Sequence, residues 1–416
     1  MKSPTIPRRF LERIPKTDLH LHLDGSLRIP TLIELARAAG VALPSETTEG
    51  LLETVFKARY SDLPDYLQGF AYTTAVLQTP EALERVAQEL GEDNIAEGVR
   101  YIEVRYAPQL HLNQGMEIRD VIGAVHRGLE RAQRAFNNRP EVQSGAELPF
   151  HYGIIVCAMR AFHPELGSYY RKLLDVMPHA PRHEIGSAAS LEMARAAVQI
   201  RDETGWPIVG FDIAGEEAGY PAGEHADAFH YAHKNFLKKT IHAGEAFGPE
   251  SIFQAITEGH ANRIGHGTFL FAADRVTDPT IADPQRYVEL LAEYIASQRI
   301  TIEVCLTSNI QTTPEIQDVR RHPVANMLDH ELSVSICTDN RLVSRTSVSD
   351  ELERLVNDVP CDPHRLRNVV VAGFKGSFFP GSYRNKRAFV RQVIRRYDEL
   401  AAEYGLASPR GGGAAG

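Results

Sequence analysis

Short apolar segments recur along the chain, and longer segments with a helical pattern of apolar positions separate them. The short segments are rich in isoleucine and valine, which is typical of strands. Between them, for example in residues 80–98 and 284–299, apolar positions recur every three to four residues, as in amphipathic helices. The pattern therefore predicts eight strands, in residues 17–23, 99–108, 151–159, 206–215, 238–245, 262–267, 300–309 and 332–340.

Strands that alternate with helices predict a parallel sheet, because parallel neighbours are joined by a crossover connection that is usually helical. Eight such units predict an α/β fold of the (β/α)8 TIM barrel type, as one domain over residues 1–405. The connection after the first strand is long and has helical patterns in residues 29–40 and 62–77, so we expect extra helices over the barrel mouth. Residues 406–416 have little apolar content and are expected to be disordered.

Charge and hydropathy narrow the range of partners. The chain has 45 basic and 54 acidic residues among 416, a net charge of -9, and no basic stripe that would bind nucleic acid. No segment approaches the roughly 18 apolar residues of a membrane span, and no apolar signal segment follows the basic N-terminus. The four cysteines are far apart, mostly in apolar runs, which predicts reduced thiols. We therefore expect a soluble cytoplasmic protein with neither nucleic acid nor membrane as a partner.

Residues able to bind a metal lie on four of the expected strands, toward their C-terminal ends. His20 and His22 are two positions apart on a strand, so both imidazoles point to the same face. His242, His266 and Asp339 come at the ends of three later strands, where the active site of such a barrel is built. Each of them alone has an ordinary structural explanation, such as a helix N-cap for Asp339. Together they predict a zinc site of three histidines and one aspartate, although the spacing does not settle which histidines bind.

A zinc site of this kind favours hydrolysis. Zinc lowers the pKa of a bound water from about 15.7 to about 7, which makes hydroxide available at neutral pH. Glu245 follows His242 by three residues, so it would lie near the metal without being needed as a ligand. It is therefore a candidate proton donor, and His266 could orient or deprotonate the attacking water.

Six motifs in this order resemble the adenosine deaminase family of the amidohydrolase superfamily, over roughly Pro15 to Ser349. They read HLHLDGS, EVRYAP, GFDIAGEE, HAGE, RIGHG and TD. The resemblance implies one Zn²⁺ per chain, because the fourth expected strand has no lysine of the kind that bridges two metals in related hydrolases. It also implies a division of roles: His20, His22, His242 and Asp339 as zinc ligands, Glu245 as the proton donor to purine N1, and His266 acting on the water.

The same resemblance implies a purine nucleoside as the substrate, in purine metabolism. Gly215 would offer its backbone N–H to purine N3, and Asp24 would accept a hydrogen bond from the ribose 5′-hydroxyl. The implied reaction is the deamination of adenosine, and of 2′-deoxyadenosine, to the inosine product plus ammonia. The chain lacks the H-x-E and P-C-x-x-C signature of the other zinc deaminases.

One position departs from the commonest family pattern. Asn340 stands where that pattern has an aspartate that contacts purine N7, and an amide can donate to N7 directly. Asp24 favours a free 5′-hydroxyl, but Asn340 leaves adenine, aminofutalosine or another 5′-modified adenosine open as the substrate. A noncatalytic nucleoside-binding relative, and a hydrolase of amides or phosphotriesters, are the alternatives of another class. The sequence does not predict the oligomeric state.

Overall fold

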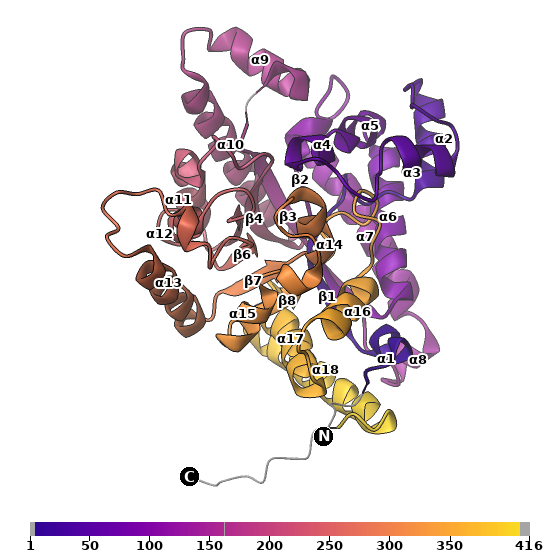
Figure 1. Cartoon of the computed structure of the whole chain (residues 1–416). Helices are drawn as coiled ribbons and strands as arrows, with labels where there is room; N and C mark the ends of the chain where they lie inside the picture. The colour runs from indigo at the N-terminus through magenta and orange to yellow at the C-terminus, as the bar shows by residue number, and fades with distance from the viewer. Residues whose placement is uncertain (1–4, 162, 408–416) are drawn as a thin grey trace.

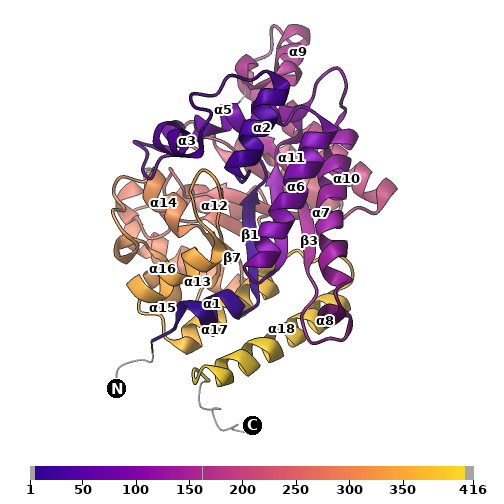
Figure 2. The same ribbon diagram turned by 90° about the vertical axis from the view of Figure 1, so that its right-hand side faces the viewer.

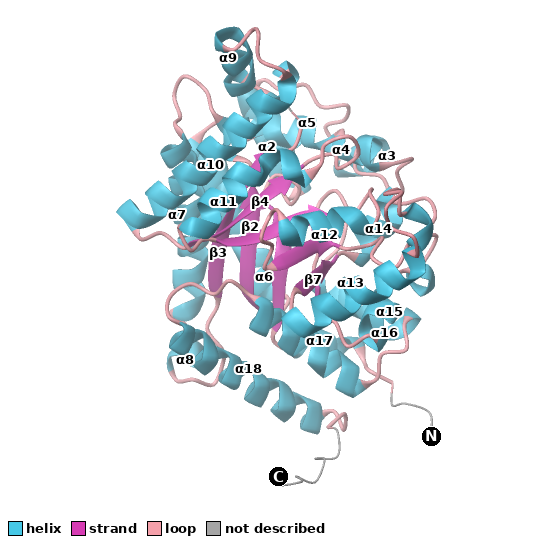
Figure 3. Cartoon of the chain, turned by 90° about the vertical axis from the view of Figure 1, so that its left-hand side faces the viewer, coloured by secondary structure: helices cyan, strands magenta, loops and turns pink. Residues whose placement is uncertain are grey.

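The computed structural model of the protein describes residues 5–161 and 163–407. Within them, eight parallel strands form one sheet in which each strand pairs with the next along the chain. Figure 3 shows this sheet at the centre of the molecule with helices around it. The strands are β1 (Lys16–His22), β2 (Val99–Tyr106), β3 (His151–Met159), β4 (Ile208–Ala214), β5 (Lys238–Ala243), β6 (Arg263–His266), β7 (Thr301–Val304) and β8 (Ser333–Ile336).

The sheet curls into a nearly closed barrel, because the residues just after β8 return to β1. The His22 N–H donates to the Asp339 carbonyl at 2.8 Å, and the Asp339 N–H donates to the His20 carbonyl, also at 2.8 Å. The expected TIM-barrel fold is therefore confirmed. The junction between the first and last strands is made by three of the candidate metal ligands, so barrel closure itself places them side by side.

Most of the helices that follow the strands surround the barrel (Figure 1). Several begin with a side-chain cap and a proline, as in α6 (Pro80–Ala96), α13 (Pro284–Gln298) and α17 (Pro363–Gly376). In these helices Thr79, Asp283 and Asp362 accept a backbone N–H. Those after β2 to β6 include α7 (Ile118–Asn137), α8 (Pro140–Gln143), α9 (Ser168–Val176), α10 (Arg182–Thr204), α11 (Ala226–Lys234), α12 (Pro249–Thr257) and α13 (Pro284–Gln298). Those after β7 and β8 are α14 (Leu306–Thr312), α15 (Val324–Asp329), α16 (Val348–Asp358), α17 (Pro363–Gly376) and α18 (Tyr383–Glu403).

Extra helices lie between β1 and β2, as expected. They and α9 are at the end of the barrel opposite the described termini, whereas α1 (Arg8–Arg13) and α18 lie at the end near the termini (Figures 1 and 2). Residues of α4 and α5 line the large cavity at the barrel mouth. The helices of this insert are α2 (Ile29–Ala39), α3 (Thr48–Thr54), α4 (Leu63–Leu67) and α5 (Gly69–Val76), and α6 (Pro80–Ala96) then leads into β2.

The seventh strand is shorter than expected. β7 ends at Val304, and the polar residues that follow form α14 instead of continuing the strand. Side chains of α14 are buried in contacts with distant segments: Thr307 bonds to Glu351, and Ser308 donates to Asp339 at 2.7 Å. Tertiary contacts therefore decide this boundary, which local pattern could not reveal.

Other expectations concern the tail, the thiols and the membrane. Most of the expected disordered tail, residues 408–416, lies outside the described residues, and Leu406 is buried in the core. Cys157, Cys305, Cys337 and Cys361 are free buried thiols. Among the described helices, none has the length and apolar character that crossing a bilayer requires.

Candidate active site

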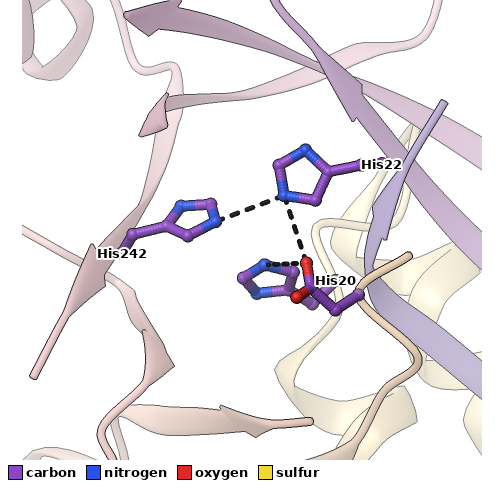
Figure 4. Close-up of side chains that lie close together, drawn as sticks. His20, His22 and His242 are labelled. Carbon is purple, nitrogen blue, oxygen red and sulfur yellow. Dashed lines mark hydrogen bonds and ion pairs between the residues drawn. The ribbon is translucent and has the colours of Figure 1, made fainter. Parts of the chain in front are cut away.

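Four candidate ligands converge at the C-terminal end of the barrel. His20 and His22 come from β1, His242 from β5, and Asp339 from the loop after β8; all four are buried. One donor atom from each lies within 4.8 Å of those of the others. In Figure 4 the rings of His22 and His242 point toward each other from opposite sides. Their Nε2 atoms are 3.2 Å apart, and Asp339 Oδ1 is 3.4 Å from both His20 Nε2 and His22 Nε2.

Buried carboxylates orient two of these histidines from behind. Glu303 Oε2 on β7 is 2.8 Å from His20 Nδ1, and Asp212 Oδ2 on β4 is 3.0 Å from His242 Nδ1. Arg105 on β2 joins the two acids, with bonds of 2.7 Å to Asp212 and 2.8 Å to Glu303. With each Nδ1 beside a carboxylate, the Nε2 atom is left to face the cluster, which is the usual arrangement around metal-binding histidines.

Sequence reasoning assigned no role to these supporting residues. A signal was present: Arg105 in EVRYAP and Asp212 in GFDIAGEE are charged residues inside otherwise apolar strands. Charged side chains are almost never fully buried unless paired, so charges in buried parallel strands indicate a network within the barrel.

Two site residues have unusual backbone conformations. His266 has φ 64° and Asp339 has φ 61°, in the left-handed region that residues with a Cβ rarely adopt. His266 stands at the end of β6 between two glycines, and a Cβ on Gly265 would come within 3.0 Å of His20 Cε1. The surrounding packing holds this strained backbone, which is common where side-chain position matters for function.

Glu245 and His266 lie next to the four candidate metal ligands. The distance from His266 Nε2 to Glu245 Oε1 is 3.6 Å, and both side chains line the cavity. Burial raises the pKa of Glu245 to about 8, although the nearby His242 partly opposes the rise. Glu245 therefore holds a proton at neutral pH. Burial also lowers the pKa of His266 well below its usual value, so this imidazole is neutral.

A second glutamate, Glu217, holds the segment that contains Glu245. Its buried carboxylate accepts four consecutive backbone N–H groups, from Gly244, Glu245, Ala246 and Phe247, at 2.7–3.0 Å. An ionised carboxylate that accepts several N–H groups binds them strongly. Glu217 belongs to the motif GFDIAGEE, but its bonds reach across some thirty residues of sequence. Sequence reasoning therefore missed it.

The three candidate substrate contacts line the same cavity, of about 770 Å³. Asp24 is buried, its Oδ1 has no hydrogen-bond partner, and burial raises its pKa to about 7. Gly215 follows β4 with φ 102°, a conformation that favours glycine. Asn340 follows Asp339, and its Oδ1 also has no partner. The structure thus brings all the predicted site residues together, with His20 beneath the others.

Asn340 also connects the C-terminal end of the barrel to the inserted helices. Its Nδ2 donates to the hydroxyl of Tyr66 on α4 at 2.8 Å, and that hydroxyl is 2.7 Å from Ser344 Oγ. Nearby, the Tyr60 hydroxyl donates to the Val343 carbonyl at 3.0 Å. Two tyrosines therefore fix the insert to the loop after β8, a contact that no local sequence signal indicates.

Comparison with solved structures agrees with this fold. An adenine deaminase from Arthrobacter aurescens matches with a TM-score of 0.71 at 22% identity, over 92% of this chain and 98% of that one. An N6-mAMP deaminase from Arabidopsis matches with a TM-score of 0.69 at 24% identity, over 93% and 99%. An amidohydrolase from Burkholderia ambifaria, solved with bound Zn, has a TM-score of 0.74 at 19% identity, over 97% of both chains.

Comparison of sequences is more specific. The family model described as adenosine deaminase matches residues 15–395. Adenosine deaminase 1 of Streptomyces coelicolor is 38% identical over 409 residues, which covers 97% of this chain and 91% of the relative. The adenosine deaminase of Mycobacterium marinum is 37% identical over 390 residues, covering 92% and 95%. The chain therefore belongs to the adenosine deaminase family of hydrolases, which act on C–N bonds.

Proposed function

We propose that the protein catalyses the zinc-dependent deamination of adenosine and 2′-deoxyadenosine to ammonia and the corresponding inosine, as a cytoplasmic enzyme of purine salvage. The observation behind the proposal is one cavity lined by three of the four candidate metal ligands, by a glutamate protonated at neutral pH and by the unpaired carboxyl of Asp24. Relatives named adenosine deaminase at 38% and 37% identity support the choice of substrate.

The donor set fits zinc. Three imidazole nitrogens and one carboxylate oxygen are ligand types that zinc binds, and their donor atoms all lie within 4.8 Å of one another, with 3.2 and 3.4 Å in three of the pairs. The zinc in the structure of the Burkholderia amidohydrolase supports the same metal. We therefore propose one Zn²⁺ per chain, held by His20, His22, His242 and Asp339. When bound, zinc supplies the Lewis acidity that makes water a nucleophile at neutral pH.

Glu245 supplies the proton that the reaction needs. Purine N1 is basic, and protonating it draws electron density from C6, so that water adds at C6. One proton of that water leaves with the 6-amino group as ammonia, and the other returns to the Glu245 carboxylate, while the proton given by Glu245 stays on N1 of the product. Because burial raises the pKa of Glu245 to about 8, its carboxyl group still has that proton to give at pH 7. His266, 3.6 Å from Glu245, acts on the attacking water.

The remaining residues would orient the nucleoside. Asp24, with its free Oδ1, accepts a hydrogen bond from the 5′-hydroxyl, and its carboxylate form repels a 5′-phosphate. Gly215 donates its backbone N–H to N3, and the Asn340 amide donates to N7. A nucleoside held this way places C6 toward the metal cluster. Small nucleosides and water are the partners in this proposal; neither nucleic acid nor membrane takes part.

The first experiment measures ammonia release and the ultraviolet change from adenine to hypoxanthine. Zinc-loaded protein is tested with adenosine, 2′-deoxyadenosine, adenine, AMP and aminofutalosine, and chelator-treated protein is the control. The highest kcat/KM for adenosine, lost on chelation and restored by zinc, supports the proposal. If another compound has the highest kcat/KM, only the substrate assignment is overturned. No turnover of any compound, with nucleoside binding retained, favours the noncatalytic alternative.

A second experiment tests the ligand set. Elemental analysis of Asp339→Ala is expected to find less than one zinc per chain, because the cluster loses its only carboxylate ligand. A full equivalent of zinc in that variant would remove Asp339 from the ligand set.

A further inference from the structure

Three hydrogen bonds connect His266 to a helix that contributes nothing to the lining of the cavity. The Val324 N–H, at the start of α15, donates to His322 Nδ1 at 3.0 Å. His322 Nε2 is 3.1 Å from Asn309 Oδ1, and Asn309 Nδ2 is 3.1 Å from His266 Nδ1. His266, Asn309 and His322 are all buried, at 2% exposure or less. Water therefore does not compete for these bonds.

The direction of each bond follows from the first. A backbone N–H can only donate, so His322 Nδ1 must be the acceptor and carries no proton. The proton of His322 is then on Nε2 and is donated to Asn309 Oδ1. The Asn309 amide nitrogen can only donate, and it donates to His266 Nδ1. His266 Nδ1 is therefore unprotonated, and the proton of this neutral ring is on Nε2.

The opposite orientation of the Asn309 amide would leave these donors and acceptors wrongly paired. It would turn the amide nitrogen toward His322 Nε2, which would then have to accept. His322 would accept at both ring nitrogens and would have no proton at all, an imidazolate that nothing nearby stabilises. A doubly protonated His322 would instead direct an N–H at the Val324 N–H. Burial, which lowers the pKa of His322 to about 3, agrees with the neutral ring.

We infer that Asn309 and His322 are positioning residues that hold His266 as the Nε2–H tautomer, so that His266 donates a hydrogen bond into the site. The inference rests on the proposed function and refines it. A ring with Nδ1 occupied by Asn309 and a proton on Nε2 offers no lone pair to a metal. His266 is thus excluded from the ligand set, a question that spacing left open.

The same tautomer decides what His266 does in the reaction. It cannot take a proton from water at Nε2, because that atom already has one, and Nδ1 faces the Asn309 amide. It therefore acts as a donor that holds the attacking oxygen and stabilises the negative charge that develops there, as oxyanion-hole donors do. Deprotonation of the water by His266, the other role considered from the sequence, is not available to this arrangement.

The direct test is ring ¹⁵N NMR of histidine-labelled enzyme, because protonated and unprotonated imidazole nitrogens have well-separated shifts. His266→Ala identifies the His266 signals by their loss. We expect the protonated shift at Nε2 and the unprotonated shift at Nδ1 in the wild type. The reverse assignment overturns the inference. This measurement does not depend on turnover, so failure to deaminate adenosine, which would overturn the proposed function, is a distinguishable result.

Asn309→Asp tests the hydrogen bonds that run from His322 through Asn309 to His266, because it reverses the direction of the bond to His266. A carboxylate can accept from both rings, so it satisfies His322 as before but draws the proton of His266 to Nδ1. We expect the two His266 ¹⁵N shifts to exchange and kcat for adenosine to fall about 100-fold, with zinc content retained. Unchanged shifts and kcat would contradict the inference. Asn326→Asp is the matched control, since Asn326 is exposed on α15; its spectrum and kcat should equal those of the wild type.

His322→Phe provides a second variant should Asn309→Asp not fold. It keeps a ring in place but removes the donor to Asn309 Oδ1, so the amide is no longer held in one orientation. We expect a mixture of His266 tautomers and a smaller loss of kcat than in Asn309→Asp. A single Nε2–H tautomer of His266 with wild-type kcat in this variant would show that His322 does not hold the Asn309 amide in its orientation.

Discussion

At the residue scale, Glu245 is the group on which the proposed chemistry most depends. Glu245→Gln nearly preserves the shape of the side chain but removes the acidic proton. We expect zinc content and nucleoside binding to stay within about twofold of wild type while kcat falls about 10²- to 10⁴-fold, the usual contribution of a general acid. Steady-state kinetics with elemental analysis checks this. Wild-type turnover would remove Glu245 from the mechanism.

Glu217 acts through Glu245 and can be tested separately from it. Glu217→Gln turns an amide donor toward N–H groups that the carboxylate accepted, so the 244–247 segment shifts. We expect kcat to fall about 10- to 100-fold, since misplacing a catalytic group by about 1 Å can cost 10²-fold. The steady-state rate at saturating adenosine measures kcat.

The double variant with Glu245→Gln distinguishes positioning from a general loss of stability. If Glu217 works by placing Glu245, adding Glu217→Gln to Glu245→Gln costs nothing more. If instead the fold decreases in kcat of the two single variants multiply in the double variant, that interpretation is contradicted. Glu250→Gln is the matched control, because Glu250 also accepts backbone N–H groups, from Thr277 and Asp278, but in a segment outside the site.

At the scale of elements, the insert between β1 and β2 works as part of the active site because α4 is tied to the loop after β8. Tyr66→Phe removes the hydroxyl that accepts from Asn340 and bonds to Ser344. Leaving a buried partner unsatisfied costs about 1–3 kcal/mol, so we expect KM for adenosine to rise at least about fivefold with little change in kcat. Initial-rate kinetics checks it, with Tyr72→Phe on α5 as the control. An unchanged KM would show that the contact does not affect substrate binding.

At the scale of the whole molecule, stability should depend on pH through histidines that are neutral in the folded state, such as the partly buried His151. His151 on β3 packs against the rings of Phe379 and Phe389, each 5.0 Å away, and burial lowers its pKa to about 4. The unfolded chain, with a histidine pKa of about 6.5, binds a proton that the folded chain does not. This histidine therefore lowers the free energy of unfolding as pH falls from about 6.5 to about 4.

His151→Phe isolates that contribution because it keeps an aromatic ring that does not titrate. We expect the variant and the wild type to differ little in pH dependence above about pH 7. Below about pH 7, the free energy of unfolding of the variant, relative to that of the wild type, should rise by up to about 1.4 kcal/mol for each pH unit lost. Urea unfolding at pH 7.5, 6 and 5 measures the difference. An equal stability difference between the two proteins at all three pH values would contradict the neutral state of the partly buried His151.

The amino-acid sequence by itself determined the eight-stranded barrel and the residues gathered at its mouth. Period-2 and period-3.6 patterns are local, and eight alternating units leave few topologies besides a closed barrel. Strand ends in such a barrel meet at one face, so His20, His242 and Asp339, far apart in the chain, could be placed together without coordinates. Helical segments of the insert were predicted in residues 29–40 and 62–77, but α3 was not, and residues 62–77 contain two helices, α4 and α5, in place of one.

Only the tertiary structure decided how those residues are held. Glu303 behind His20, Glu217 beneath Glu245 and Tyr66 beside Asn340 come from elements distant in the chain, so no local pattern pairs them. β7 ends early and α14 begins there for the same reason, because the residues after Val304 are held by contacts with residues distant in the chain. The tautomer of His266 depends on Asn309 and His322, because a proton's position is set by the whole set of hydrogen bonds around a ring, and that set exists only in the fold.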